Sequence, residues 1–568
     1  MRATAFHCEV RGPHCLGLQS LVLMLATACL PALPQTAPAA SGTATASGGY
    51  RIAGTVVNSA TGEPVRGATV AALSEADSHT IAVQETGEDG HFSLAGLAAA
   101  KYQLTASRRG FRTAFYDEHE EFSTAIVTGA GQDTEQLTFR LPPGAVVHGV
   151  VTGDGGDPVE GARVILFRKP GAHKAADRIT QAEETNTDDT GAYEFANLAA
   201  GEYLLAVKAE PWFALHGSAN RRRVIMSDGA EPNAALDVAY PVTFFDSTTE
   251  ESAATPIVLA SGSREEADIN LHATPALHLV VDAPRKADGS IARAELWQTV
   301  FGIPISAENS GFMGALRTGS MEFAGLAPGQ FELTQGDPPR IAELNLAASQ
   351  QVEPGIGAPS VAVSGTIRST DGPVPASATV MLVSADGPLR QNTVQAACIR
   401  GAFNFQEVPP GVWKLMVGSL GTGSGNRFRV VATTVDGATH AGDTVTVRDH
   451  PLQVQVTVSH VSTEMEGFAR RDGKGVAGVM IVLAPKSLGG MKSLARRDQS
   501  DSDGSFALRD VGPGQYTVVA IEDGWDLDWE QPDVIRRYLR GGVAVTVLDS
   551  AGKLLTLPEA VPVQNRQP

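Results

Sequence analysis

The stretch Asp503-Gly-Ser-Phe506-Ala-Leu508-Arg-Asp-Val511-Gly-Pro-Gly514-Gln-Tyr516-Thr-Val518 decides the fold of this 568-residue chain. Large apolar residues recur at every second position on both sides of the Pro-Gly pair, and such positions in a strand face the same side of a sheet. The Pro-Gly pair, like the Asp-Gly pair that opens the stretch, is typical of turns. The stretch therefore predicts turn, strand, turn and strand, with one apolar face.

This window occurs five times along the chain. The copies start at Gly90, Gly191, Gly319, Gly401 and Gly504. Each has an aromatic residue twelve positions later: Tyr102, Tyr203, Phe331, Trp413 and Tyr516. Because an aliphatic residue follows two positions on, we expect these aromatics to point into a core rather than to stack on sugar rings.

A second pattern precedes the windows and supplies further strands. In the first copy, the apolar run 52–57 leads into Gly62-Glu-Pro-Val-Arg-Gly-Ala-Thr-Val70, and the second copy has Asp157-Pro-Val-Glu-Gly-Ala-Arg-Val164. The third copy retains less of this pattern. The spacing of the copies is of the size of a sandwich domain, and no strong amphipathic helix separates the strands. The sequence thus predicts an all-β tandem array.

We expect the chain to divide at the ends of these patterns. The predicted segments are a signal peptide and processing region (1–39), a linker (40–49), repeat 1 (50–142), repeat 2 (144–273), a degenerate repeat 3 (274–352), repeat 4 (360–459) and repeat 5 (464–560).

The N-terminus has the features of an export signal. Arg2 and Arg11 precede the apolar stretch 21–26, which small residues follow, with cleavage expected after Ala28 or Ala39. Cys29 directly follows Ala28, so two outcomes stay open: a lipid anchor on Cys29, or its loss with the discarded peptide. The apolar run is too short to span a bilayer. We expect an exported protein, extracellular, periplasmic or attached to the cell envelope, with no transmembrane helix in the mature chain.

Composition narrows the class of protein and of partner. Hydrophobic residues make up 43% of the chain, enough for folded cores, and the formal net charge of −19 disfavours nucleic acid as a partner. Three of the four cysteines lie before residue 30, and Cys398 is alone in the body of the chain. No disulfide is therefore expected to hold the mature protein together.

The two patterns together resemble the carboxypeptidase regulatory-like domain of secreted bacterial repeat proteins. The resemblance runs over roughly residues 50–560 and is strongest in repeats 1, 2 and 5. It implies about five transthyretin-like or Ig-like β-sandwich domains, a fold also called carbohydrate-binding-like, after the signal segment. Because the shared residues are turn and core residues, the resemblance implies no particular ligand. The His-x-x-Glu of the family's zinc-dependent catalytic partners is absent from the 13 histidines.

Two acidic segments have alternative interpretations. Asp501-Ser-Asp503-Gly504 resembles part of a calcium loop, but it lacks the further oxygen ligands, and turn chemistry is the simpler interpretation. The cluster 117–121, Asp-Glu-His-Glu-Glu, suits a metal or a basic partner, or else a solvated loop.

Aromatic residues in two loops are the candidate ligand platforms. Trp212 and Phe213 follow the last strand of the window in repeat 2, and Trp525 and Trp529 follow that of repeat 5. Loops at one end of a sandwich commonly carry binding residues.

These features predict a non-catalytic, exported scaffold or adhesion module that contacts an unknown protein or glycan. We expect no catalytic residue, no metal ligand and no cofactor. A carbohydrate-binding protein is the first alternative, and an accessory subunit of an unidentified hydrolase is the second.

Overall fold

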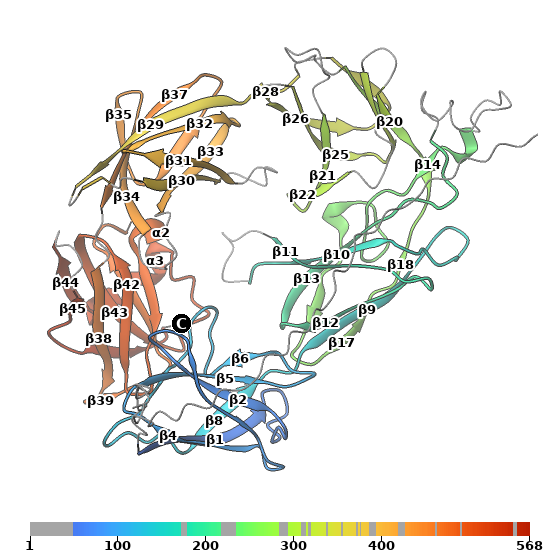
Figure 1. The fold of residues 1–568 in the computed structure, drawn as a ribbon. Helices are drawn as coiled ribbons and strands as arrows, with labels where there is room; N and C mark the ends of the chain where they lie inside the picture. Colours follow the sequence, from blue (N-terminus) through green and yellow to red (C-terminus); the bar gives the residue numbers. More distant parts are fainter. Residues whose placement is uncertain are drawn as a thin grey trace, which may run out of the picture. The chain divides into compact units, whose positions relative to one another are not determined.

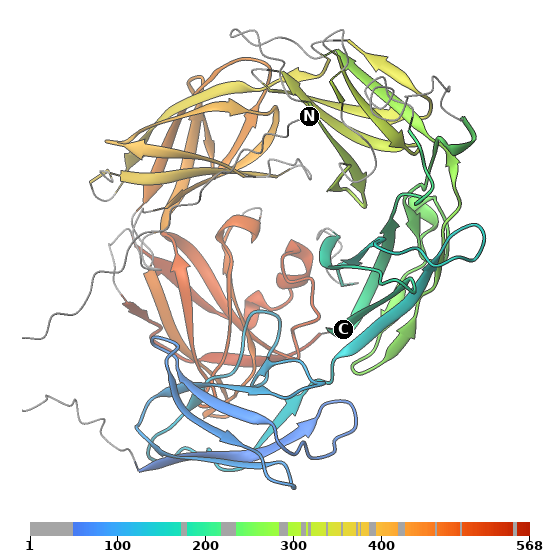
Figure 2. The ribbon, with the colours of Figure 1, turned by 45° about the vertical axis from the view of Figure 1, so that its right-hand side comes forward.

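The fold is that of a computed structural model. It describes residues 49–567 apart from 172–178, 217–233, 283–293, 308–313, 316–319, 337–338, 354–355, 371–372, 375–376, 386–392, 419–426, 460–462, 489–490 and 549–553. Strands make up nearly all of the regular secondary structure in both views (Figure 1 and Figure 2), which confirms the predicted all-β class. Residues 47–568 cluster as one unit, so the number of separable domains and the repeat boundaries stay predictions.

Repeat 1 is a sandwich of two sheets (Figure 1). Its strands are β1 (Tyr50–Asn58), β2 (Thr69–Ser74), β3 (Thr80–Glu85), β4 (His91–Leu97), β5 (Lys101–Ser107), β6 (Ala114–Phe115), β7 (Ile126–Val127) and β8 (Leu137–Leu141). One sheet has the order β4-β1-β8, and the other has the order β3-β2-β5-β6 with β7 also on β5. β1 runs antiparallel to β4 and parallel to β8.

Repeat 2 has the same strand arrangement. Its elements are β9 (Ala145–Thr152), β10 (Arg163–Arg168), β11 (Thr180–Asn186), β12 (Ala192–Leu198), β13 (Gly201–Lys208), η1 (Ala234–Leu236), β14 (Val238–Ala239), β15 (Thr243–Phe244), η2 (Glu251–Ala253), β16 (Ile257–Leu259), β17 (Arg264–Glu266) and β18 (Ile269–Asn270). The two sheets are β12-β9-β17 and β11-β10-β13-β15, with β18 on β9 and β16 on β13. The pattern shared by the two sequences therefore produces the same topology.

Repeat 3 also has two sheets, although its sequence is the least typical. Its strands are β19 (Thr274–Pro275), β20 (Leu277–Asp282), β21 (Glu295–Val300), β22 (Ile303–Ser306), β23 (Gly314–Ala315), β24 (Ser320–Leu326), β25 (Gly329–Gly336), β26 (Pro339–Leu346), β27 (Gln350–Val352) and β28 (Ala358–Pro359). The sheet orders are β23-β24-β20-β27 and β22-β21-β25-β26-β28, and β19 pairs with β14 of repeat 2.

In repeat 4 the strands join into one nine-stranded sheet. They are β29 (Val361–Ser369), β30 (Ser377–Ser384), β31 (Thr393–Ile399), β32 (Ala402–Val408), β33 (Gly411–Gly418), β34 (Arg427–Val435), β35 (Ala438–Ala441), β36 (Thr444–Val447) and β37 (Leu452–Ser459). Pairing of β31 with β32 and of β33 with β34 links the two layers.

Repeat 5 adds short helices to the same strand pairs. Its elements are β38 (Thr463–Arg471), β39 (Lys474–Gly475), β40 (Met480–Pro485), α2 (Met491–Leu494), β41 (Arg496–Gln499), β42 (Ser505–Val511), β43 (Gly514–Glu522), α3 (Pro532–Ile535), η5 (Leu539–Gly541), β44 (Val543–Val547), β45 (Leu554–Thr556) and β46 (Val561–Asn565). β38 pairs with β42, and β40 pairs with β43. Of the helices in the described part of the chain, none has the length and apolar character needed to cross a membrane.

The period-two residues of the windows form the cores. The aromatics at the twelfth position are all buried, as predicted: Tyr102, Tyr203, Phe331, Trp413 and Tyr516. Where that aromatic carries a donor, the donor binds the carbonyl four residues earlier: Tyr102 on Ala98, Tyr203 on Ala199, Trp413 on Pro409 and Tyr516 on Gly512. The side chain therefore fills the core and also satisfies the turn that precedes its strand.

The first glycine of the window is required by both backbone and space. Gly90 has a φ of 73°, which residues with a Cβ rarely adopt. A Cβ there would lie 2.6 Å from the carbonyl oxygen of Val56. Gly504 has a φ of 84° and the same close approach to the carbonyl of Ala469, so the turn before β42 is built like the turn before β4.

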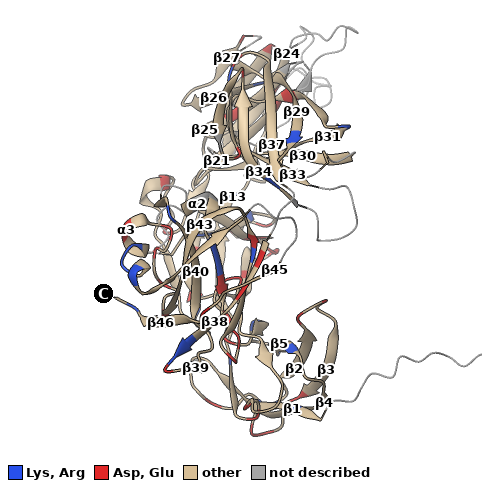
Figure 3. Ribbon diagram, turned by 90° about the vertical axis from the view of Figure 1, so that its left-hand side faces the viewer, with Lys and Arg blue, Asp and Glu red and all other residues tan. Residues whose placement is uncertain are grey.

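Charge is mixed along the elements. Figure 3 shows Asp and Glu interspersed with Lys and Arg on the ribbon, rather than gathered on one strand or helix of this view.

Candidate binding surface between repeats 1 and 5

The acidic cluster predicted from sequence lies in a loop that joins β6 to β7. The loop is stabilised from within, because His119 and Phe122 exchange backbone hydrogen bonds of 2.9 and 3.0 Å. Both strands that flank it pair with β5, so the loop leaves the edge of the sheet and returns to it. This loop carries the carboxylates of Glu120 and Glu121 next to the rings of His119 and Phe122.

Arg497, on β41 of repeat 5, binds this loop. One of its guanidinium nitrogens donates to Glu120 Oε2 at 2.5 Å and lies 3.4 Å from Glu121 Oε1. The Arg497 side chain is only 7% exposed. Its guanidinium carbon lies 5.0 Å from the ring centroid of Phe122 of repeat 1. The cluster thus has a basic partner within the same chain.

Two tryptophans of repeat 5 complete the environment of Arg497. The guanidinium carbon lies 5.5 Å from the ring centroid of Trp525 and 4.9 Å from that of Trp529. His119 stacks on Trp525 with the ring centroids 4.9 Å apart and the planes 9° apart. The Trp525 indole N–H donates to the carbonyl of Gly478 at 3.1 Å, which fixes the ring. A flat, weakly hydrated guanidinium suits this set of aromatic faces and carboxylates.

Asp501, whose side chain is 9% exposed, makes a second contact between the two repeats. Its carboxylate accepts hydrogen bonds from Lys101 Nζ at 2.6 Å and from the backbone N–H of Ala125 at 3.1 Å. Burial lowers the pKa of the Lys101 ammonium, but the charge of Asp501 and the hydrogen bond outweigh this and raise that pKa above its ordinary value. The segment interpreted as a turn or a calcium loop is therefore a turn that binds an ammonium group.

Neutral hydrogen bonds lie between the two charged contacts. Gln499 Nε2 donates to the carbonyl of Asp117 at 2.6 Å and to Thr124 Oγ1 at 2.8 Å. The N–H of Ser502 donates to the carbonyl of Ala125 at 2.9 Å, and its hydroxyl oxygen accepts from the N–H of Val127 at 2.8 Å. Thr124 and Gln499 are almost fully buried. Buried polar groups are costly unless paired, and here each pair spans the two repeats.

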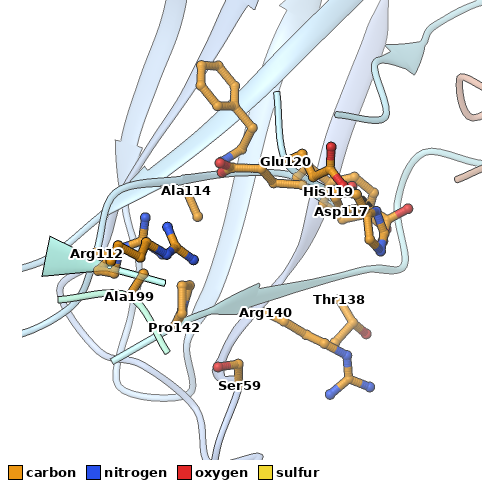
Figure 4. A pocket seen from close by; sticks show the side chains of 14 residues that line it. Ser59, Arg112, Ala114, Asp117, His119, Glu120, Thr138, Arg140, Pro142 and Ala199 are labelled. Atoms are coloured by element: carbon orange, nitrogen blue, oxygen red, sulfur yellow. Dashed lines mark hydrogen bonds between the residues drawn. The ribbon is translucent and has the colours of Figure 1, made fainter. Parts of the chain in front are cut away.

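An open hollow of about 710 Å³ lies on the other side of the acidic loop. Figure 4 shows Arg112 and Arg140 on one part of its wall and Asp117, His119 and Glu120 on another. Ser59 also lines it, but no hydrogen bond joins Ser59 to His119 among the residues that the structure describes, and His119 Nδ1 faces Gln499 Oε1 at 3.2 Å. The wall is polar and carries both signs of charge, and none of its described residues forms a hydrogen-bonded pair of nucleophile and base.

The predicted ligand platforms differ in exposure. Trp525 and Trp529 are half-buried and pack against the core of repeat 5 rather than standing open in a loop. Trp212 is 89% exposed and Phe213 is 36% exposed, and their rings meet edge to face at 5.7 Å. Ligand contact by any of the four stays a prediction, and Cys29 lies outside the described residues.

Two buried ionisable groups were not singled out from sequence. Burial lowers the pKa of Lys208 to about 7, and the ammonium donates to the carbonyl of Ser306 in repeat 3. Burial raises the pKa of Asp498 to about 7, and its carboxylate accepts from the N–H of Ala507 at 2.7 Å. Perturbed pKa values often mark active sites, but neither residue lines the hollow. Lys208 ends β13, whose pattern reads as core, and Asp498 lies in β41, whose residues read as a polar surface, so no local signal identified either one.

A further set of ionisable side chains joins repeats 2 and 3. His216 Nδ1 and His278 Nε2 bind the two carboxylate oxygens of Asp237, at 2.9 and 2.8 Å. Their other ring nitrogens bind Glu210 and Glu322. Within the described residues, no group of three or more His, Cys, Asp or Glu has the arrangement of a metal site. These five ionisable side chains therefore bind repeat 2 to repeat 3.

Comparison with known protein families finds a match in the N-terminal part of the chain. Residues 36–142 and 146–224 match the sequence profile of the carboxypeptidase regulatory-like domain. Among curated proteins, no match to this chain is found.

Several solved structures match this chain at low sequence identity. A streptococcal ancillary pilin is 11% identical over 52% of this chain and 99% of its own, with a TM-score of 0.18. GBS52, the minor pilin of Streptococcus agalactiae, is 12% identical over 40% and 97%, with a TM-score of 0.20. Two B repeat units of the collagen-binding protein of Staphylococcus aureus are 11% identical over 72% and 100%, with a TM-score of 0.12.

The sequence profile and the observed topology agree where they overlap. The profile covers repeat 1 and the first part of repeat 2, and the strands of these two repeats pair in the same order. The resemblance seen in the sequence is thus confirmed for residues 36–142 and 146–224, which are similar to the carboxypeptidase regulatory-like domain.

Proposed function

We propose that this chain is an exported, non-catalytic scaffold whose sandwich domains present loops to a protein or matrix partner. The observation that carries the proposal is that ionisable side chains, buried or half-buried, join one repeat to another. Lys101, Asp501 and Arg497 connect repeats 1 and 5, and His278 connects repeats 2 and 3. Such groups hold an assembly of domains in place, which a scaffold needs and a reaction does not.

Localisation and activity are tested together. The full-length protein is expressed with its own N-terminus, the cells are fractionated, and the mature N-terminus is determined by mass spectrometry. We expect the protein in the envelope or medium, cleaved after Ala28 or Ala39. The purified protein is then assayed on panels of esters, peptides and glycosides, and we expect no turnover. Retention of the uncleaved protein in the cytosol, or turnover that one Ser or Asp substitution abolishes, would contradict the proposal.

Carbohydrate binding is the second candidate, and the exposure of Trp212 favours it. An indole that is 89% exposed, with Phe213 beside it, offers a flat apolar face of the kind that packs on sugar rings. The Trp525 ring is already stacked against His119. A glycan array therefore distinguishes the two platforms: binding that Trp212→Ala removes and Trp525→Ala retains supports this candidate, and no binding by the unmodified chain refutes it.

A further inference from the structure

Repeats 1 and 2 share an acidic segment at the same place in their sandwiches. We name these segments the acidic tails: residues 116–122 in repeat 1 and residues 245–251 in repeat 2. Each leaves the sheet after a two-residue strand, β6 or β15, that pairs with the aromatic-bearing strand of the window. The chain then returns to that same strand through β7 or β16. The acidic tails are therefore structurally equivalent excursions from one sheet edge.

The acidic tail of repeat 2 contacts repeat 3. Glu251 Oε2 accepts a hydrogen bond of 2.9 Å from the backbone N–H of Phe301. The Phe301 ring packs edge to face on Phe244, with centroids 5.1 Å apart, and on Phe167 at 5.2 Å. A carboxylate from the tail and a ring beside it thus hold one residue of the next repeat.

The acidic tail of repeat 1 makes the equivalent contact with repeat 5, which is separated from it by more than 370 residues of sequence. Its carboxylates bind Arg497, and its rings pack on Trp525 and on the Arg497 guanidinium. Arg497 Nε and Nη1 are buried without a hydrogen-bond partner, so aromatic faces and the tail carboxylates provide its stabilisation. Removing the tail would leave a nearly desolvated cation without its counter-charge, which is strongly unfavourable.

We propose that the acidic tails are docking elements, and that the surface of repeat 5 around Arg497 is the binding site for the tail of repeat 1 of the same chain. The two tails are not interchangeable, because one recognises a guanidinium between aromatic rings and the other a backbone N–H beside a phenylalanine. Specific pairing of this kind fixes which repeats meet. The first and last repeats are thereby clasped together, in addition to the contacts that neighbouring repeats make.

Cysteine trapping tests the clasp in the full-length chain. Ala125→Cys and Ser502→Cys are introduced together, with the four native cysteines changed to Ala. These two residues lie on neighbouring backbone segments, joined by a hydrogen bond of 2.9 Å from the N–H of Ser502 to the carbonyl of Ala125, and a disulfide requires such closeness of the two backbones. We expect an intrachain disulfide in dilute protein, seen as a faster band on a non-reducing gel, with a yield independent of protein concentration.

Substitutions then test whether the acidic tail of repeat 1 stabilises the contact with repeat 5. Arg497→Ala, and separately Glu120→Gln with Glu121→Gln, should slow disulfide formation by at least about tenfold, because the buried charge loses its partner. The matched control is Arg509→Ala, whose guanidinium lies 3.8 Å from Glu75 of repeat 1 but is 68% exposed, and it should leave the rate unchanged.

Three results would overturn the proposal: no disulfide, disulfides only between chains, or equal rates in all variants. If Arg497→Ala fails to fold, the glutamine variant of the exposed tail decides the question alone.

Discussion

Raising the pH should loosen the contact between repeats 2 and 3. The series Glu210, His216, Asp237, His278 and Glu322 alternates carboxylates with imidazoles across this contact. Each ring has a carboxylate at both nitrogens, an arrangement that an imidazole satisfies only when it is protonated and donates from both. The hydrogen bond to Glu322, helped by Asp237 against the effect of burial, raises the pKa of His278 to about 9.

The size and sign of the effect follow from that pKa. A pKa raised from 6.5 to about 9 corresponds to roughly 3 kcal/mol of stabilisation, at about 1.4 kcal/mol for each unit. Because the pKa in the folded state lies above that in the unfolded chain, this stabilisation is complete below about pH 6.5 and is lost as the pH rises through about 9. Burial lowers the pKa of His216, but its hydrogen bonds to Glu210 and Asp237 raise it overall, so it acts in the same direction.

Hydrogen exchange is the suitable assay, since a chain of several repeats does not unfold in one step. Exchange of the segment 274–282, which includes the hydrogen bond from the N–H of Ala276 to the carbonyl of Asp237, is compared at about pH 6 and about pH 9.5 after correction for intrinsic rates. Protection should fall about a hundredfold, by the conversion of tenfold for each 1.4 kcal/mol. In the His278→Gln variant, the same segment should be poorly protected from exchange at both pH values. Unchanged protection, or an equal pH dependence in the variant, would refute the reasoning.

Three further predictions concern stability. Tyr516→Phe should cost about 1 kcal/mol, because only the hydrogen bond from the buried hydroxyl is lost; hydrogen exchange of the β43 amides measures it, and a neutral result would contradict the turn-closing role. Gly90→Ala should lower the melting temperature more than Gly62→Ala, because both backbones have positive φ but only the first Cβ would meet a carbonyl, that of Val56; equal losses would disprove the steric account. Trp212→Ala should change the stability by less than about 0.5 kcal/mol, because the ring is exposed, and a larger loss would show hidden packing.

The parts of the fold that the sequence predicted are those whose signal is local. A strand of alternating apolar residues that ends in a turn is recognised within about fifteen residues, and Tyr102 and Leu104 are buried together as that alternation requires. The repetition of the window strengthened the prediction of strands and turns, because chance does not produce the same hairpin pattern five times in one chain. In the other repeats a glycine of the first strand, such as Gly54, pairs with the aromatic residue two positions into the window. Even in repeat 3, where Val281 stands at that position opposite Met321, the antiparallel pairing of β20 with β24 is retained.

The interactions between repeats could not be predicted in the same way. Glu120 and Arg497 are separated by 377 residues, and nothing in either neighbourhood specifies the other. The acidic composition of the loop suited either a basic partner or a solvated loop, and composition alone did not distinguish the two.

The half-buried tryptophans show why the composition of a segment does not predict the exposure of its side chains. In Gly524-Trp-Asp-Leu-Asp-Trp529 the aspartates suggest an exposed loop, and an exposed loop suggests that the indoles are free for a ligand. The Arg497 guanidinium explains why these tryptophans are half-buried in a polar segment. It is flat enough to pack against the rings, and its charge requires carboxylates at its edge. Trp525 and Trp529 are therefore covered by a cation, and that cation is supplied by a strand whose sequence, Arg-Arg-Asp-Gln over β41, reads as a polar surface. Burial at such a site is a property of the pair of surfaces, and it appears in neither sequence segment when each is read alone.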